Sequence, residues 1–112
     1  MSDTADQPAR RRVVRRKALL SGKLVYGESG FSVDCVIRDV ADQGAHIRLA
    51  SDLPISARVW LIVIRTGFAY DATVAWRRPP EFGLKFEQKV DLKDPTGRPP
   101  EHLRRLWLAL TS

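Results

Sequence analysis

Apolar side chains alternate with other residues along most of this 112-residue chain. Such alternation predicts strands with one buried face, because successive side chains of a strand point to opposite sides of its sheet. The predicted inward positions are Leu24 and Tyr26; Val33, Cys35 and Ile37; Ala45, Ile47 and Leu49; Tyr70, Ala72, Val74 and Trp76; and Phe82, Leu84 and Phe86. The segment 58–65 is almost continuously apolar, which is typical of a strand covered on both faces. The chain therefore predicts about six strands.

Short turns carrying Gly, Pro, Asp or Ser separate these segments, and no helix-length pattern interrupts them. Parallel strands need long crossover connections, so a mainly β fold, an antiparallel barrel or sandwich, is favoured. The end of the chain differs, because apolar residues recur there at helical spacing. These residues are Leu103, Leu106, Trp107 and Leu110. Pro99 and Pro100 suit a first helical turn, so we expect an amphipathic helix over residues 99–111 that packs on the barrel.

The net charge of +6 and the pI near 10.1 indicate an anionic partner: nucleic acid, a nucleotide or a membrane surface. Six of the eight residues at 10–17 are basic, directly before the first predicted strand. They are Arg10, Arg11, Arg12, Arg15, Arg16 and Lys17. Residues 1–9 are polar and predict a disordered tail, which leaves a domain over 10–112 whose first segment, 10–17, is a basic arm. Charge alone would allow this arm to bind any polyanion without specificity.

Other sequence features exclude several functional classes. Cys35 is the single cysteine and falls on a predicted inward face, which predicts a core residue and a reducing compartment. His46 and His102 have no neighbour at metal-ligand spacing and are expected to be plain surface histidines. The chain has no phosphate-cradling glycine motif, no signal-peptide core and no apolar run long enough to span a bilayer. We therefore expect a cytoplasmic protein that is not an enzyme, needs no metal or cofactor and does not insert into membranes.

Two short motifs carry a more specific pattern. The arm contains R-x-x-x-R spacing twice, in Arg11 with Arg15 and in Arg12 with Arg16. The sequence DVADQG at residues 39–44 forms a predicted tight turn between two strands. Together these segments resemble the PilZ family, whose signature is RxxxR followed by [D/N]xSxxG. The segments VAWRR at 74–78 and GLKF at 83–86 are also similar to that family's later strands, so the resemblance covers roughly residues 10–110.

The resemblance implies a six-stranded antiparallel β-barrel with a C-terminal helix. It also implies that this domain binds cyclic di-GMP. Arginine suits this ligand, because its planar fork binds phosphate or a guanine edge bidentately and stacks on bases. The second motif implies that Asp39 accepts hydrogen bonds from guanine and that Gly44 lets the backbone approach the ligand. Ala41 stands where the family has serine, a difference worth about 1 kcal/mol. Alternation predicts Trp76 as a core aromatic, with support of the ligand face or of a partner surface as its alternative role.

These features lead to one main interpretation and two alternatives. The main one is a single-domain receptor, monomeric or weakly dimeric, whose arm arginines fold over cyclic di-GMP and signal to a downstream protein. The resemblance implies outputs such as motility or biofilm control, and no specific nucleic acid is expected. One alternative is a basic barrel that binds nucleic acid, which would need exposed aromatics, whereas most aromatics here fall on predicted inward positions. The other is a PilZ-like interaction module without ligand binding, for which Ala41 would be the first sign.

Overall fold

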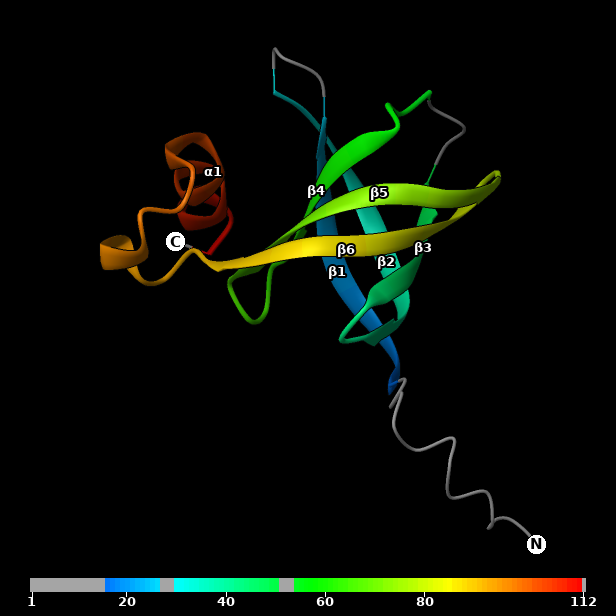
Figure 1. Cartoon of the computed structure of the whole chain (residues 1–112), viewed down its shortest axis with the longest axis horizontal. Coiled ribbons are helices and arrows are strands. Elements are labelled where there is room, and N and C mark those ends of the chain that lie inside the picture. Colours follow the sequence, from blue (N-terminus) through cyan, green and yellow to red (C-terminus); the bar gives the residue numbers. More distant parts are fainter. Residues whose placement is uncertain (1–15, 27–29, 51–53, 112) are drawn as a thin grey trace, which may run out of the picture.

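The sheet closes into a barrel of antiparallel strands in the order β1-β2-β3-β6-β5-β4 (Figure 1). This computed structural model describes residues 16–26, 30–50 and 54–111, with side chains from Leu19 onward. The strands are β1 (Arg16–Tyr26), β2 (Phe31–Ala41), β3 (Gly44–Leu49), β4 (Arg58–Val63), β5 (Phe68–Arg78) and β6 (Glu81–Asp91). The prediction of a mainly β, six-stranded antiparallel barrel is confirmed. The expected tail at 1–9 and the arm residues up to Arg15 lie outside the described residues.

Inward-facing side chains of all six strands fill the barrel. The largest fully buried members are Leu24, Ile37, Ile47, Leu49, Leu61 and Phe82. Cys35 belongs to the same cluster and is 5% exposed, which confirms its predicted core position. Burial away from water disfavours the thiolate and raises the pKa of Cys35 to about 12. The period-two pattern therefore specifies most of this interior.

The strand β4 has apolar residues on both faces, as its continuous apolar sequence predicts. Val59 and Leu61 face the barrel interior, whereas Ile62 belongs to a second cluster outside it. This second cluster consists of Val25, Ile62, Ala69, Leu92 and Leu103, with Trp60, Val90, Leu106 and Trp107 packed against it. The barrel wall at β1, β4 and β5 is thus buried on both sides.

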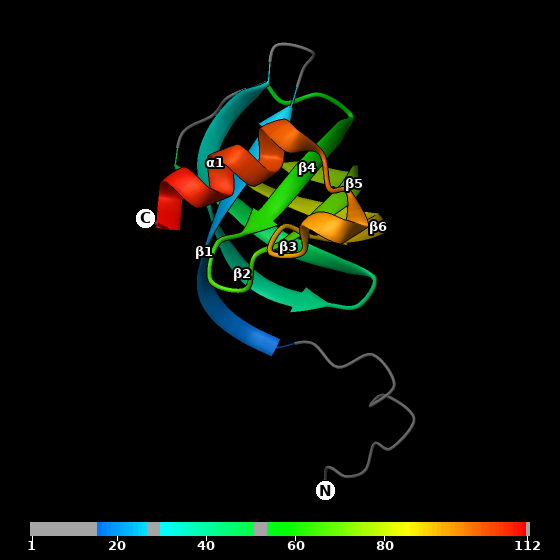
Figure 2. The same cartoon turned by 90° about the vertical axis from the view of Figure 1, so that its left-hand side faces the viewer.

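The helix α1 (Glu101–Thr111) covers this outer cluster (Figure 2). It begins two residues later than predicted, since Pro100 accepts the first bonds, from the backbone N–H groups of Leu103 and Arg104. Leu103 is fully buried, and Trp107 donates its indole N–H to the Ile64 carbonyl at 2.8 Å. Leu110 was expected on the packed face, but it is 37% exposed and lies outside the cluster beneath α1.

A 3₁₀ turn, η2 (Pro95–Gly97), connects β6 to α1. Asp94 caps this turn by accepting a hydrogen bond from the Thr96 backbone N–H at 3.0 Å. In the part of the chain that the structure describes, no helix is both long and apolar enough to cross a membrane.

Candidate ligand-binding site

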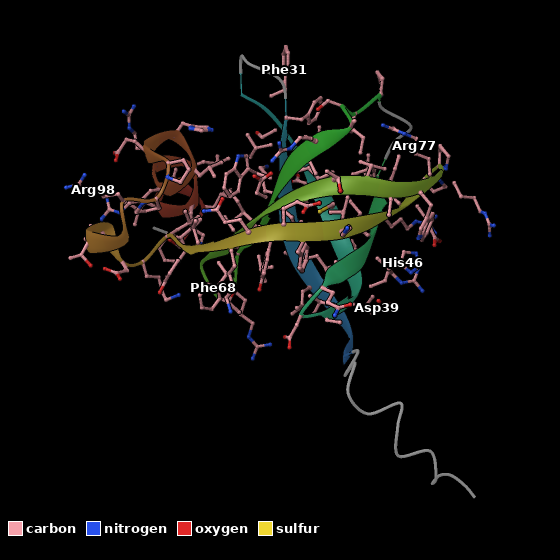
Figure 3. The ribbon with its side chains drawn as sticks, viewed as in Figure 1. Phe31, Asp39, His46, Phe68, Arg77 and Arg98 are labelled. Atoms are coloured by element: carbon pink, nitrogen blue, oxygen red, sulfur yellow. The ribbon has the colours of Figure 1, made fainter. Side chains whose placement is uncertain are left out.

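A row of residues in cross-strand register runs across five neighbouring strands of the barrel. In the ladders Lys17 pairs with Asp39, Asp39 with His46, His46 with Gly83, and Gly83 with Trp76. We call these five residues the cross-strand row. Figure 3 shows Asp39 and His46 together on the side of the barrel away from α1. The arm predicted at 10–17 ends in β1, at the start of this row.

The outward position of Trp76 comes from a β-bulge. The β5–β6 register shifts between Val74 and Trp76, so Val74 packs against the core while Trp76 leaves it. A one-residue shift moves a side chain to the opposite face of a sheet. Trp76 is 44% exposed, so the prediction of a core aromatic is wrong. Its exposed position is compatible with the alternative role, support of the ligand face or of a partner surface, which stays a prediction.

Two positions on this face require glycine because a side chain there would collide with a neighbour, and the neighbour differs between them. A Cβ atom on Gly83 would collide with the indole ring of Trp76, which lies directly over this glycine. A Cβ atom on Gly44 would collide with the backbone carbonyl of Leu84 in β6. Gly44 is therefore required by the close approach of β3 and β6, a structural role that the motif alone did not predict.

A groove of about 580 Å³ runs along this face between the tip of the β2–β3 hairpin and Trp76. It is lined by Ala41, Gln43, Gly44, Ala45, His46, Ala75, Trp76, Gly83, Leu84, Lys85 and Phe86. Its volume lies within the range of small-molecule sites, about 300–1,000 Å³. The groove thus unites three predicted site residues, Ala41, Gly44 and Trp76, and His46 links it to a fourth, Asp39.

Of the four arginines predicted to bind the ligand, the structure describes only Arg16. Arg16 is the first residue of β1 and pairs with Val40, the neighbour of Asp39, in the ladder. Arg11, Arg12 and Arg15 lie outside the described residues. The motif at 39–44 is also more extended than predicted, because β2 continues through Ala41 and the turn occupies only residues 42–43.

His46 has contacts on both sides of its ring, so the prediction of a plain surface histidine is wrong for this residue. Its Nε2 lies 2.5 Å from Glu81 Oε1, and its Nδ1 lies 3.5 Å from Asp39 Oδ2. Its ring also meets the Trp76 ring edge to face, with centroids 5.4 Å apart. A two-residue turn at 42–43 pairs Ala41 with Gly44 and Asp39 with His46, so hairpin register would have placed His46 beside the motif.

Glu81 is a further residue that the sequence did not indicate. It begins β6, and its Oε2 lies 3.5 Å from Arg48 Nη1 and 3.9 Å from Arg38 Nη1. The hydrogen bond with His46 is the main cause that holds the pKa of Glu81 below its usual range, and both arginines act in the same direction. Glu81 is therefore an ionised carboxylate at neutral pH.

A family model, the PilZ domain, matches residues 9–106, which includes both arginine spacings, the 39–44 motif and all of the cross-strand row. No curated protein matched the chain. The matched region extends from the arm to Leu106 in α1 and so spans every strand of the barrel. The chain therefore belongs to the PilZ domain family, a family of cyclic di-GMP receptors and not of enzymes.

Proposed function

We propose that this protein is a cyclic di-GMP receptor whose ligand lies on the cross-strand row and in the adjoining groove. Asp39 accepts hydrogen bonds from a guanine edge, and Trp76 offers its ring to a base. The arm arginines, Arg11, Arg12, Arg15 and Arg16, bind the phosphates and guanine edges of the same ligand. The closed arm then presents a changed surface to a downstream protein in motility or biofilm control. In this role the protein acts in the cytoplasm, without a cofactor and without catalysing a reaction.

The observation that carries this proposal is the strand register. It aligns the end of the arm, the Asp39 carboxylate and the exposed Trp76 ring across the barrel, although they come from distant parts of the sequence. An acceptor for guanine N–H groups and a stacking surface thus lie in register with Lys17 of β1, the strand into which the arginine-rich segment of the sequence leads. Because ligand shifts a population only through differential contacts, the arginines supply the contacts that favour the closed arm.

A nucleic-acid-binding barrel is less well supported, although two aromatics are exposed. Phe31 is 62% exposed and Trp76 is 44% exposed; of these two, only Trp76 was predicted to face inward. Phe31, however, lies in the hairpin between β1 and β2, far from the Asp39 and His46 end of the barrel in Figure 3. Single-stranded nucleic acid needs successive stacking platforms along one groove, and these two rings do not form one.

The proposal can be tested by calorimetry of the full chain with cyclic di-GMP, GTP and a short oligonucleotide in parallel. We expect saturable binding of cyclic di-GMP. Arg15→Ala should weaken it about ten- to a hundredfold, the effect of losing a charge-assisted contact. Arg65→Ala, a change at an exposed arginine in the β4–β5 turn, is the matched control and should leave affinity unchanged. Salt-sensitive oligonucleotide binding without heat from cyclic di-GMP would refute the proposal in favour of the nucleic-acid alternative. If none of the three ligands gave heat of binding, the alternative of an interaction module without ligand binding would be favoured.

A further inference from the structure

His46 connects the two groups to which the proposed function assigns recognition of a base. It lies between Asp39 on β2 and Trp76 on β5, and it contacts both of them. Its side chain is only 27% exposed, and that of Asp39 is 16% exposed, so both are held by their neighbours. A shift of the imidazole would therefore move the carboxylate and the indole relative to each other.

Glu81 fixes the imidazole from the opposite side. The 2.5 Å distance between His46 Nε2 and Glu81 Oε1 is that of a short hydrogen bond. Because an ionised carboxylate can only accept, Nε2 is the nitrogen that donates. The second oxygen of Glu81 faces Arg48 and Arg38, which restrain the carboxylate in turn. Asp39, His46 and Glu81 thus form a chain of side chains over three neighbouring strands.

We infer that His46, held by Glu81, is a positioning residue that sets the Asp39 carboxylate and the Trp76 ring for one guanine base. The inference rests on the proposed function and adds a determinant of base selectivity to it. Guanine presents N–H donors at its N1 and N2 positions to a carboxylate, whereas adenine has an acceptor at N1. Correct placement of Asp39 therefore favours guanine over adenine, while stacking on Trp76 favours both bases alike.

The test compares the affinities of the full chain for cyclic di-GMP and cyclic di-AMP. We expect His46→Ala to reduce the ratio of the two affinities about fivefold, the effect of one misplaced hydrogen bond. Glu81→Gln keeps the side-chain volume, removes the charge and should reduce the ratio in the same direction. His102→Ala is the matched control, because His102 is the other histidine of the chain and lies exposed on α1. It should leave the ratio unchanged.

Two further readouts separate positioning from general loosening of the barrel. In the ligand-free chain, the NMR signal of the Trp76 indole N–H, identified by its loss in Trp76→Phe, should move in His46→Ala and Glu81→Gln but not in His102→Ala. The double variant of His46→Ala and Glu81→Gln should be no less selective than His46→Ala alone, because Glu81 acts through His46. Should His46→Ala fail to fold, Glu81→Gln carries the test.

The outcomes distinguish this inference from the proposed function. If the native chain bound neither cyclic dinucleotide, the proposed function would be wrong. If it bound cyclic di-GMP and both variants kept the native selectivity, the positioning role would be wrong and the receptor function would stand. An equal loss of affinity for both ligands would also contradict the inference, since it would show a role independent of the Asp39 carboxylate.

Discussion

Residue 41 is the position at which a single side chain is expected to change the affinity of the candidate site. Ala41 ends β2, pairs with Gly44 and lines the groove beside Trp76. A serine at this position would add a hydroxyl where the family signature has one. Because one neutral hydrogen bond contributes about 1 kcal/mol, we expect Ala41→Ser to bind cyclic di-GMP several-fold more tightly in calorimetry.

The control for this prediction is Ala50→Ser, at an exposed position beyond the end of β3. It should leave the affinity unchanged. A gain that is the same in both variants would show that residue 41 does not contact the ligand.

The sequence identifies some site residues better than others. Asp39, Ala41 and Gly44 follow from a motif, and the structure places them in or beside the groove. Alternation predicts the wrong face for Trp76, because no sequence pattern reveals the bulge that precedes it. Glu81 could not be found, because its contact with His46 depends on how β6 pairs with β3, and this pairing is non-local.

At the scale of strands, we expect a methyl group added at Gly44 or at Gly83 to affect stability in different ways. Gly44→Ala sets a methyl group against the backbone of β6, which cannot move without breaking the ladder. Gly83→Ala sets it against the Trp76 indole, which can rotate into solvent. We expect Gly44→Ala to lower the free energy of unfolding by about 1–3 kcal/mol in urea titrations.

The strand-scale prediction is checked by adding Trp76→Ala to each glycine variant. This second change should relieve most of the destabilisation by Gly83→Ala and none of that by Gly44→Ala. Equal relief in both would contradict the assignment of Gly44 to the contact between β3 and β6.

The strands themselves were well predicted, whereas their lengths were not. The alternating inward positions Val33, Cys35 and Ile37 fall in β2 (Phe31–Ala41), and Phe82, Leu84 and Phe86 fall in β6 (Glu81–Asp91). Both strands continue past the predicted ends, because outer-face residues such as Asp39 and Lys89 belong to the ladders without an apolar signal. The helix was placed correctly, but its last leucine was not, since the face that packs depends on the underlying strands.

At the scale of the whole molecule, Cys35 reports on the cooperativity of the barrel. Its thiol is buried within the interior cluster, and burial raises its pKa from 9.0 to about 12. Since the thiolate is the reactive form, we expect no reaction with a disulfide reagent at pH 8 until the barrel unfolds. Labelling rates across a urea titration should follow the loss of β-sheet signal in circular dichroism.

The sign of the pH effect follows from the same burial. The neutral thiol is favoured in the folded state, so its contribution to stability is complete below pH 9.0 and is lost as the pH rises toward about 12. Labelling that precedes unfolding at pH 8 would mean that the wall around Cys35 opens locally.

The architecture as a whole was predictable because each of its two apolar clusters corresponds to a recognisable hydrophobic pattern in the sequence. Period-two segments encode the barrel interior, and the continuous run at 58–65 together with the helical stripe encodes the outer cluster. The pairing of β1 with β4, which closes the barrel, has no such sequence pattern. Its ladder joins residues 22–25 to residues 60–63, which are distant in sequence. The family resemblance supplied that closure.

The pairing of Lys17 with Asp39 has a consequence for binding energetics. The sequence joins the arm arginines covalently to Lys17, so in the proposed receptor their encounter with a ligand bound at Asp39 would be intramolecular. Short tethers give effective concentrations in the millimolar range, far above those of a free signalling nucleotide or a separate partner. In the proposed receptor, weak individual arginine contacts would therefore add up to strong retention, and an insertion between Arg15 and Arg16, the first residue of β1, would weaken binding without removing any arginine.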